Sequence, residues 1–307
     1  MLVFRGFHRP SPSATVLTLG NFDGVHRGHL ALLERLRTVA QAHGLPASLV
    51  TFEPHPREFF APDSAPARLT TLREKLRYFT LAGVEQTYVA HFNQAFAGLS
   101  ADAFVEQILV QCLQVRHVII GDDFRFGAGR LGDFAYLQAA GRACGFAVEA
   151  MKSVVLGGER VSSSVVRQAL AEGDMAKAAT LLGRPYAIDG RVVHGRKLGR
   201  QLGFATANIY IRHNPLPMSG VFAVRVLEPG GPVRQGVANL GIRPTLGGTR
   251  PLLEVHIFDF QGDIYGAHLS VEFVHKLRDE MKFSDLSALQ ARIAADAVAA
   301  RAFFSAE

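Results

Sequence analysis

The chain has 307 residues, of which 48% are hydrophobic and 20% are charged, and its formal net charge is +6 at pH 7. This length predicts two domains, and the composition is that of an ordinary soluble globular protein. The basic surplus forms no clustered stripe, no apolar run reaches the length of a membrane span and the N-terminus lacks a signal-peptide core, so we expect a cytoplasmic protein that binds neither nucleic acid nor a membrane.

Between residues 15 and 151, short apolar runs alternate with amphipathic segments. The expected strands are TVLTLG, ASLVTF, QTYVAHF, VRHVIIG and FAVEAM, and the expected helices cover residues 29–42, 70–82, 101–114 and 133–143. Strands separated by helices pair in parallel, so we expect a Rossmann-like, doubly wound α/β sheet. Ligands of such sheets bind beyond the carboxyl ends of the strands, where GNFDG, EPHP and GDDFRFG follow.

Two histidines, His26 and His29, stand where the first of these strands turns into a helix. Gly20 and Gly24 let the backbone approach a ligand there, and the first helical turn offers N–H groups to an anion. Imidazoles in this position can donate hydrogen bonds to phosphoryl oxygens. A metal pair is the weaker interpretation, because HRGH lacks the i, i+4 spacing and the glutamate of a zincin helix. Capping or core histidines are the third possibility.

The two cysteines, Cys112 and Cys144, lie in largely apolar helical patterns. Nothing near them has the spacing of a zinc site. We therefore expect both to be buried, reduced thiols, which is consistent with a cytosolic location.

The pattern changes after Gly183-Arg184-Pro185. The runs IDGRVVHG, GVFAVRVLE, RQGVANLG, PLLEVHIFDF and HLSVEFVHKL follow one another with Gly/Pro turns and no helix between them, which predicts an antiparallel barrel or sandwich. Residues 284–303 then predict one terminal amphipathic helix. We place the two domains at residues 1–183 and 184–307.

The second half contains a basic, glycine-rich loop, GRKLGRQLGFATAN. It lacks the Walker pattern GxxxxGK[ST]. The backbone N–H groups and the cationic side chains of such a loop are nevertheless suited to bind a phosphate. A solvated surface loop is the alternative. The candidate phosphate-binding residues of this loop are Gly195, Arg196, Lys197, Gly199 and Gly203.

A carboxylate stands within the run LLEVHIFDF. Strand alternation places Glu254, His256 and Phe258 on one face. A carboxylate on a core-facing strand is costly unless it is used, and Glu254 is suited to accept the proton of an attacking hydroxyl. The exposed face of an edge strand is the alternative.

The ordered motifs resemble one family. GxFDGxHxGH is the pattern of HxGH nucleotidyltransferases, and with FEPHP (52–56), GDDFRFG (121–127) and VSSSVVR (161–167) it resembles the adenylyltransferase domain of the bacterial bifunctional riboflavin kinase / FAD synthetases. HGRKLGRQLGFATANI, NLGIRPTLGG and LEVHIFDFQGDIYG are similar to the riboflavin kinase domain of that family. The resemblance covers nearly the whole chain. It implies an enzyme that phosphorylates riboflavin to FMN and adenylylates FMN to FAD, with ATP as the donor in both steps.

For the first half, the resemblance implies catalytic roles for His26 and His29. The implied ATP-binding residues are Gly20, Phe22, Asp23, Gly24, His26, His29, Ser162, Ser163, Ser164 and Arg167. The serines suit the N-cap and first turn of a helix, and Arg167 suits the neutralisation of a triphosphate. A simple helix cap is the alternative for the serines. Ser164 stands where the family usually has threonine, so the hydroxyl is kept.

The implied flavin-binding residues of the first half are Phe52, Pro54, Pro56, Asp123, Phe124 and Arg125. The phenylalanines offer stacking surfaces and the prolines fix the loop. Asp123 or Arg125 is suited to hold the phosphate end of the bound nucleotide or the edge of its adenine ring. By composition alone, these phenylalanines are more often core residues than ligand contacts.

For the second half, the resemblance implies that Thr206 and Asn208 hold a Mg²⁺–nucleotide and that Glu254 is the catalytic base. Mg²⁺ is thus the expected cofactor. Ala205 replaces the usual proline of this motif, which removes a backbone restraint but neither oxygen ligand.

Two other functions fit the residues taken singly. One is an adenylyltransferase for another phosphorylated acceptor, with a barrel that only binds substrate. The other is a nucleic-acid-binding protein, which would bind RNA or DNA in a strongly salt-dependent way. The motifs favour small-molecule partners, namely ATP, riboflavin and FMN, and leave the oligomeric state open.

Overall fold

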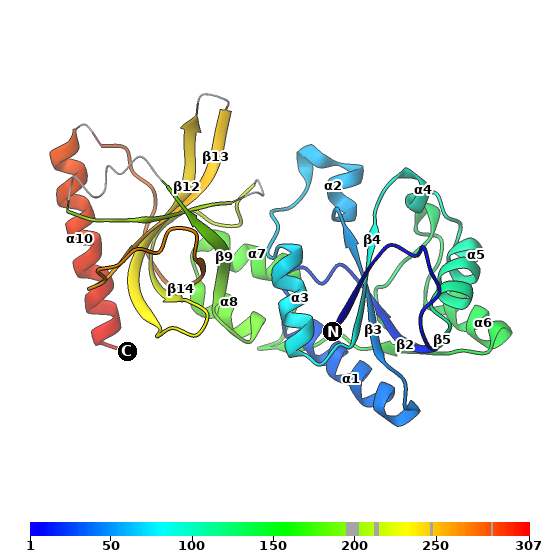
Figure 1. Cartoon of the computed structure of the whole chain (residues 1–307). Coiled ribbons are helices and arrows are strands. Elements are labelled where there is room, and N and C mark those ends of the chain that lie inside the picture. The colour runs from blue at the N-terminus through cyan, green and yellow to red at the C-terminus, as the bar shows by residue number, and fades with distance from the viewer. Residues whose placement is uncertain (195–202, 212–214, 246–247, 284) are drawn as a thin grey trace. The chain divides into compact units, whose positions relative to one another are not determined.

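The computed structural model describes residues 1–194, 203–211, 215–245, 248–283 and 285–307 (Figure 1). By packing, the chain divides into two compact units. The first comprises Met1–Pro66 and Thr70–Ser162, and the second comprises Ala67–Leu69 and Ser163–Glu307. Helices α7 (Ser163–Glu172) and α8 (Met175–Leu182) thus pack within the second unit. A division by packing does not fix a division by function, so the domain boundary at residue 184 stays a prediction.

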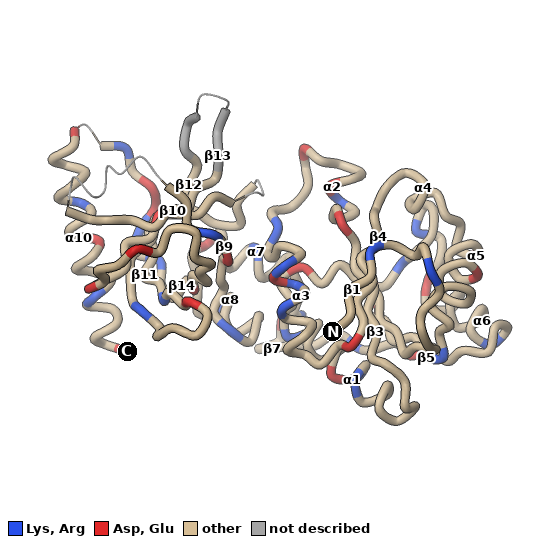
Figure 2. Tube along the Cα trace, viewed as in Figure 1, with Lys and Arg blue, Asp and Glu red and all other residues tan. Residues whose placement is uncertain are grey.

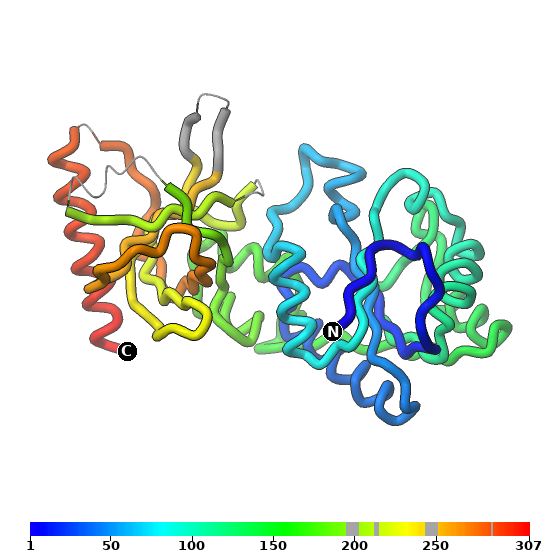
Figure 3. The backbone as a smooth tube through the Cα atoms, viewed as in Figure 1, coloured from blue at the N-terminus to red at the C-terminus, as the bar shows by residue number. Residues whose placement is uncertain are grey.

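The first unit contains a six-stranded sheet in the order β1-β4-β3-β2-β5-β6, with every neighbouring pair parallel. Its strands are β1 (Leu2–Arg5), β2 (Thr15–Leu19), β3 (Ala47–Glu53), β4 (Gln86–His91), β5 (Val115–Gly121) and β6 (Ala147–Met151). The predicted doubly wound sheet is confirmed. The additional strand β1 lies at the edge of the sheet, where the first residues of the chain run beside β4 (Figure 3).

Helices connect these strands and cover the sheet. They are α1 (Arg27–His43), α2 (Pro56–Phe60), α3 (Leu72–Leu81), α4 (Gln94–Ala97), α5 (Ala101–Ala103) continuing into the π-helix η2 (Phe104–Cys112), and α6 (Phe134–Cys144). Val16 packs in a core with Leu33 of α1, whereas its neighbour Leu17 packs in a second core with Leu109 of η2. Successive residues of a strand point to opposite faces, so a sheet covered on both sides needs continuous apolar strands.

The second unit contains a closed antiparallel barrel of six strands in the order β10-β13-β12-β11-β14-β9. The strands are β9 (Tyr186–Val193), β10 (Ala207–Tyr210), β11 (Gly220–Leu227), β12 (Arg234–Thr245), β13 (Gly248–Ile257) and β14 (His268–Arg278). The barrel is confirmed over the sandwich. Short β10, within the FATANI segment, was not among the expected strands.

The terminal helix α10 (Leu286–Ser305) packs against the outside of this barrel. Val237 of β12 and Phe258, which directly follows β13, join Ala297 and Ala300 of the helix in one apolar cluster. The intervening side chains of β13, such as Val255, are fully buried and fill the inside of the barrel. The strands therefore present an inner apolar face and an outer face that α10 covers in part.

The cysteines are both free thiols, and they differ in exposure. Cys112 is buried as predicted, and burial raises the pKa of its thiol. Cys144 is exposed, so its predicted burial is wrong: it is the last residue of α6, next to the left-handed cap residue Gly145. None of the helices in the described ranges is both long and apolar enough to cross a membrane.

Candidate active sites

Three of the singled-out loops lie at one edge of the parallel sheet. GNFDG follows β2, EPHP follows the end of β3 and GDDFRFG follows β5, and these three strands are neighbours in the order β3-β2-β5. The three loops therefore leave the carboxyl ends of adjacent strands, as expected. The chain runs from β2 to β3 in one direction and returns to β5 on the other side of β2, so this edge includes the topological switch point at which such folds bind ligands.

The two histidines that follow the GNFDG segment are stacked on each other. Their ring centroids lie 3.6 Å apart with an interplanar angle of 16°. His26 is the N-cap of α1, and its Nδ1 accepts a hydrogen bond of 3.3 Å from the backbone N–H of His29. A neutral imidazole that accepts at Nδ1 carries its proton on Nε2, so Nε2–H is the donor of the His26 ring. The capping alternative and the phosphate-facing role are thus compatible.

The loop before the histidines has a tightly turned backbone. Phe22, Gly24 and Val25 have φ angles of 50°, 81° and 42°, in the left-handed region that costs energy for residues other than glycine. The buried carboxylate of Asp23 accepts hydrogen bonds from the backbone N–H and the hydroxyl of Thr70, and this hydroxyl accepts one from the Gly24 N–H. Asp23 therefore holds the loop in place, and its predicted contact with ATP stays a prediction. Thr70 was not singled out in the sequence because it lies far from the motif.

Gly28, between the two histidines, was also not singled out. A Cβ atom placed on Gly28 would lie 3.1 Å from Cε1 and 3.2 Å from Nδ1 of His26. These contacts are tighter than ordinary van der Waals distances, so a side chain at residue 28 would require the His26 ring to shift by a few tenths of an ångström. The glycine in HRGH is explained by this packing, a signal that appears only when the ring is placed.

The EPHP loop leads from β3 into α2. The Glu53–Pro54 peptide bond is cis, and Pro56 occupies the first turn of α2, where a proline loses no helical hydrogen bond. Phe52 packs partly buried against the core and contacts Phe92 and Phe96 edge to face or tilted. The prolines thus shape the loop as expected, while flavin stacking on Phe52 stays a prediction.

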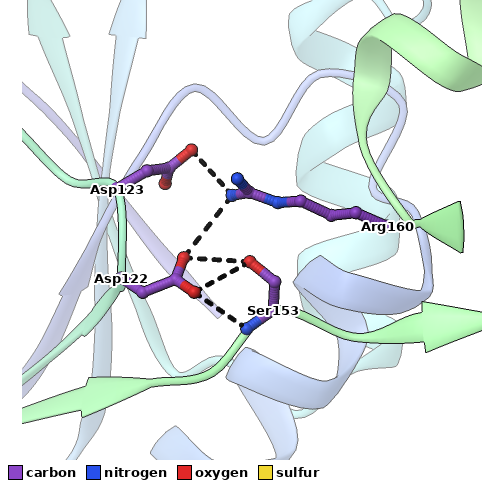
Figure 4. Close-up of polar contacts among 4 residues, drawn as sticks. All are labelled: Asp122, Asp123, Ser153 and Arg160. Atoms are coloured by element: carbon purple, nitrogen blue, oxygen red, sulfur yellow. Dashed lines mark hydrogen bonds and ion pairs between the residues drawn. The ribbon is translucent and has the colours of Figure 1, made fainter.

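An arginine reaches the end of β5 from a small hairpin (Figure 4). The strands β7 (Val155–Leu156) and β8 (Glu159–Arg160) form this hairpin. Arg160 donates to Asp123 at 2.7 Å and approaches Asp122 at 3.5 Å, and Asp122 also accepts from the hydroxyl and the backbone N–H of Ser153. Burial alone raises the pKa of Asp122, but the hydrogen bonds from Ser153 and the charge of Arg160 outweigh it and hold this pKa below its ordinary value.

The other candidates of GDDFRFG have partners within the chain. Arg125 forms a 2.9 Å ion pair with Asp133, the N-cap of α6. Phe124 stacks with Phe126 at 5.8 Å, and Phe126 is buried against Gly132. Phe126 is therefore a core residue, while the flavin-binding roles of Asp123, Phe124 and Arg125 stay predictions.

The serine-rich segment begins α7. Ser162 directly precedes the helix, and Ser163 and Ser164 lie in its first turn, as predicted. Nε of Arg167 donates to the carbonyl oxygen of Ala67 at 2.6 Å, which fixes the direction of this side chain. These residues of α7 belong to the second compact unit, so their approach to His26 stays a prediction.

Three polar side chains form a row across the outer face of the barrel. Asn208 of β10 is paired in register with Glu254 of β13, and Glu254 is paired in turn with Asn239 of β12. Strand β13 lies between two partners, so the edge-strand alternative for Glu254 is wrong. The core-facing position is wrong too: Leu253 and Val255 fill the interior, and Glu254 between them is half-buried on the outside.

The ATAN segment borders this row. The carbonyl oxygen of Ala205 lies 2.9 Å from Nδ1 of His256, the neighbour of Glu254 on the same face. A carbonyl can only accept, so Nδ1 of His256 carries a proton in this contact. Asn208 Nδ2 donates to the carbonyl oxygen of Thr206 at 3.3 Å, which turns its Oδ1 away. Ala205 thus contributes a hydrogen bond that restrains the segment.

The remaining candidates of the basic loop, Gly195, Arg196, Lys197 and Gly199, lie outside the described residues. Gly203 is described, with φ of 84°. Along the Cα trace of each unit, Lys and Arg positions are interspersed with Asp and Glu positions (Figure 2).

Comparisons with known proteins match the two halves separately. A family model described as FAD synthetase matches residues 8–165, and one described as riboflavin kinase matches residues 182–304. The chain is 50% identical to the bifunctional riboflavin kinase/FMN adenylyltransferase of Escherichia coli K12 over 99% of this chain and 98% of that protein. It is 48% identical to the protein of the same name from Haemophilus influenzae, over 99% and 100% of the two chains.

A solved structure described as a macrolide-efflux protein from Streptococcus pneumoniae has the same fold, with a TM-score of 0.81 and 28% identity over 96% of this chain and 97% of that one. Its description differs from those of the curated relatives. Those relatives match this chain from end to end at much higher identity, and both family models match in the order that the motifs predict. The chain therefore belongs to the family of bifunctional riboflavin kinases/FMN adenylyltransferases.

Proposed function

We propose that the outer face of the barrel at Glu254 is the riboflavin kinase site, and that the edge of the parallel sheet at His26 and His29 is the FMN adenylyltransferase site. The enzyme carries both activities of its family: riboflavin and ATP give FMN and ADP, and FMN and a second ATP give FAD and pyrophosphate. The observation that carries the assignment of the kinase site is the register of β10 and β13, which pairs Asn208 with Glu254.

In the kinase step, Glu254 accepts the proton of the ribityl 5′-hydroxyl. The hydroxyl oxygen forms a bond to the γ-phosphorus, the bond from that phosphorus to the β–γ bridging oxygen breaks, and ADP leaves. A half-buried carboxylate suits such a base, and most of the rate enhancement comes from positioning and charge neutralisation.

The residues beside Glu254 fit a Mg²⁺–nucleotide. Thr206 and Asn208 offer oxygen donors, which are the ligands that Mg²⁺ prefers. The hydrogen bond from Asn208 Nδ2 to the Thr206 carbonyl leaves the Asn208 Oδ1 for another partner. When bound, Mg²⁺ neutralises charge on the transferred phosphoryl group. Gly203 and the rest of the basic loop are assigned to the nucleotide phosphates.

In the adenylyl transfer, an oxygen of the FMN phosphate attacks the α-phosphorus of ATP and pyrophosphate leaves. The Nε2–H of His26, with His29 stacked on it, and the N-terminus of α1 donate to the phosphoryl oxygens as negative charge builds up. Ser162, Ser163, Ser164 and Arg167 are assigned to the triphosphate. The EPHP and GDDFRFG loops are assigned to the flavin, because they leave adjacent strands at the same edge.

We also infer that the enzyme works in the cytoplasm. Its two cysteines are free thiols, which suits a reducing compartment. ATP and flavins, its expected partners, are small molecules.

The direct test supplies the purified protein with riboflavin, ATP and Mg²⁺, and separately with FMN, ATP and Mg²⁺, and separates the flavins by chromatography. We expect FMN and FAD in the first mixture and FAD in the second. FAD from FMN without FMN from riboflavin would leave the barrel as a binding domain only. If neither product forms and the protein binds RNA at low salt, the nucleic-acid alternative would be correct.

A further inference from the structure

An unsatisfied acceptor lies beside the proposed base. Asn239 of β12 is paired in register with Glu254, so their side chains stand on the same outer face, with Cβ atoms of such pairs about 4.5–5.5 Å apart. The Oδ1 atom of Asn239 is buried, and within the described residues it has no hydrogen-bond partner. Leaving a buried acceptor unpaired costs about 1–3 kcal/mol.

The chemistry of the neighbours determines what can satisfy this atom. An ionised Glu254 can only accept, so an interaction between the two side chains uses the Asn239 Nδ2 donors and leaves Oδ1 facing elsewhere. The phosphoryl oxygens of ATP nearest to the reacting centre also only accept. The substrate group that donates next to Glu254 is the ribityl chain of riboflavin, which carries several adjacent hydroxyls.

We propose that Asn239 is a riboflavin-binding residue of the kinase site, whose Oδ1 accepts a hydrogen bond from a ribityl hydroxyl next to the one that is phosphorylated. Asn239 of β12 and Glu254 of β13 are neighbours across paired strands. When Asn239 holds one ribityl hydroxyl, the contact brings the 5′-hydroxyl of the same ribityl chain to Glu254. Asn239 then selects for a polyol acceptor. This inference rests on the proposed location of the kinase site at this face of the barrel.

The test compares Asn239→Ala with Gln235→Ala. Gln235 lies on the same strand and face but is exposed, so its replacement removes an amide without touching the proposed contact. Asn239→Ala should lower kcat/KM for riboflavin by about tenfold, the effect of one hydrogen bond. The KM for ATP and the formation of FAD from FMN should stay unchanged, and Gln235→Ala should behave as wild type.

Riboflavin analogues that lack single ribityl hydroxyls identify the contact by a double-mutant cycle. One of the three analogues, which lack the 2′-, 3′- or 4′-hydroxyl, should lack the group that Asn239 contacts. For that analogue, Asn239→Ala should cause no further fall in kcat/KM. An equal loss for riboflavin and all three analogues would overturn the proposal, and so would an unchanged kcat/KM for riboflavin.

Stability separates this role from a structural one. Asn239→Leu keeps a similar volume and removes the unpaired acceptor, so its melting temperature should equal or exceed that of wild type while riboflavin turnover falls. A lower melting temperature with unchanged affinity for riboflavin would mean that Asn239 is structural.

Thr206→Ala separates failure of this inference from failure of the proposed site. If Thr206→Ala impairs FMN formation and Asn239→Ala does not, only the inference is wrong. If neither variant alters FMN formation, the kinase site is not on this face and both proposals are wrong.

Discussion

His26 Nδ1 accepts the backbone N–H of His29, and the rings of the two residues stack with their centroids 3.6 Å apart. The arrangement orients both imidazoles at the first turn of α1. It also fixes the proton of His26 on Nε2, because Nδ1 is used as the acceptor. A helix start, a cap and a pair of phosphoryl donors are thus built from the same four residues.

Replacement of His29 by alanine tests the phosphoryl role. His29→Ala should lower FMN adenylylation by about a hundredfold or more, the scale for loss of one preorganised donor. FMN formation from riboflavin should be nearly unchanged in the same assay. His43→Ala, at the last residue of α1, is the matched control and should leave both rates near wild type. Equal loss of both activities in His29→Ala would contradict the assignment of two sites.

Gly28→Ala tests the packing of the His26 ring. Alanine favours the helix over glycine by about 1 kcal/mol, so the melting temperature should hold or rise. Adenylylation should nonetheless fall, because the new Cβ would lie 3.1 Å from the His26 ring and push it away. Thermal unfolding and FAD formation measured on one preparation check both effects. A stable variant with full adenylylation would show that the position of the His26 ring is unimportant.

The surface cluster of His117, Glu149, Arg35 and His43 predicts a pH dependence of stability. Burial lowers the pKa of His117 below the ordinary histidine value of 6.5, against the opposing effect of Glu149 at 3.6 Å. The unfolded chain therefore binds a proton on this side chain before the folded protein does, and stability is lost as the pH falls below about 6.5.

The pKa of Glu149 is lowered, chiefly by its hydrogen bond to Arg35. The stability that this carboxylate contributes is therefore present above the ordinary glutamate pKa of 4.5 and is lost as the pH falls further. Replacing His117 removes the group whose lowered pKa makes the folded protein lose stability below about pH 6.5. In His117→Gln, the free energy of unfolding should fall less than in wild type between pH 7 and about pH 5.5. Urea unfolding at several pH values measures this. Parallel curves for the two proteins would mean that His117 titrates alike in both states.

The sequence predicts the elements of both units well because their patterns differ in period. The continuous apolar runs around Val16 and Leu17 require a sheet covered on both faces, and the alternation in LLEVHIFDF places Glu254, His256 and Phe258 on one face. Alternation cannot tell which of the two faces is the interior. Glu254 was expected on a core-facing strand, whereas the large apolar residues Leu253 and Val255 take the inside of the closed barrel.

Contacts between segments that lie far apart in the sequence could not be predicted from it either. The hydrogen bonds of Thr70 to Asp23 and the pairing of Asn239 with Glu254 join residues that no local pattern connects. The ion pair of Arg160 with Asp123 likewise depends on the β7–β8 hairpin, whose strands are too short to produce a pattern. Such residues become visible only when the register and the loops are placed.

The most direct test of the two-site account is Glu254→Gln, assayed for both reactions. The variant keeps the size of the side chain and most of its hydrogen bonding but removes its basicity. FMN formation from riboflavin should fall by about a hundredfold or more, with little change in riboflavin affinity, while FAD formation from supplied FMN and ATP continues at close to the normal rate. Kinase turnover like that of wild type in Glu254→Gln would contradict the account, and His256, on the same face, would become the next candidate for the base.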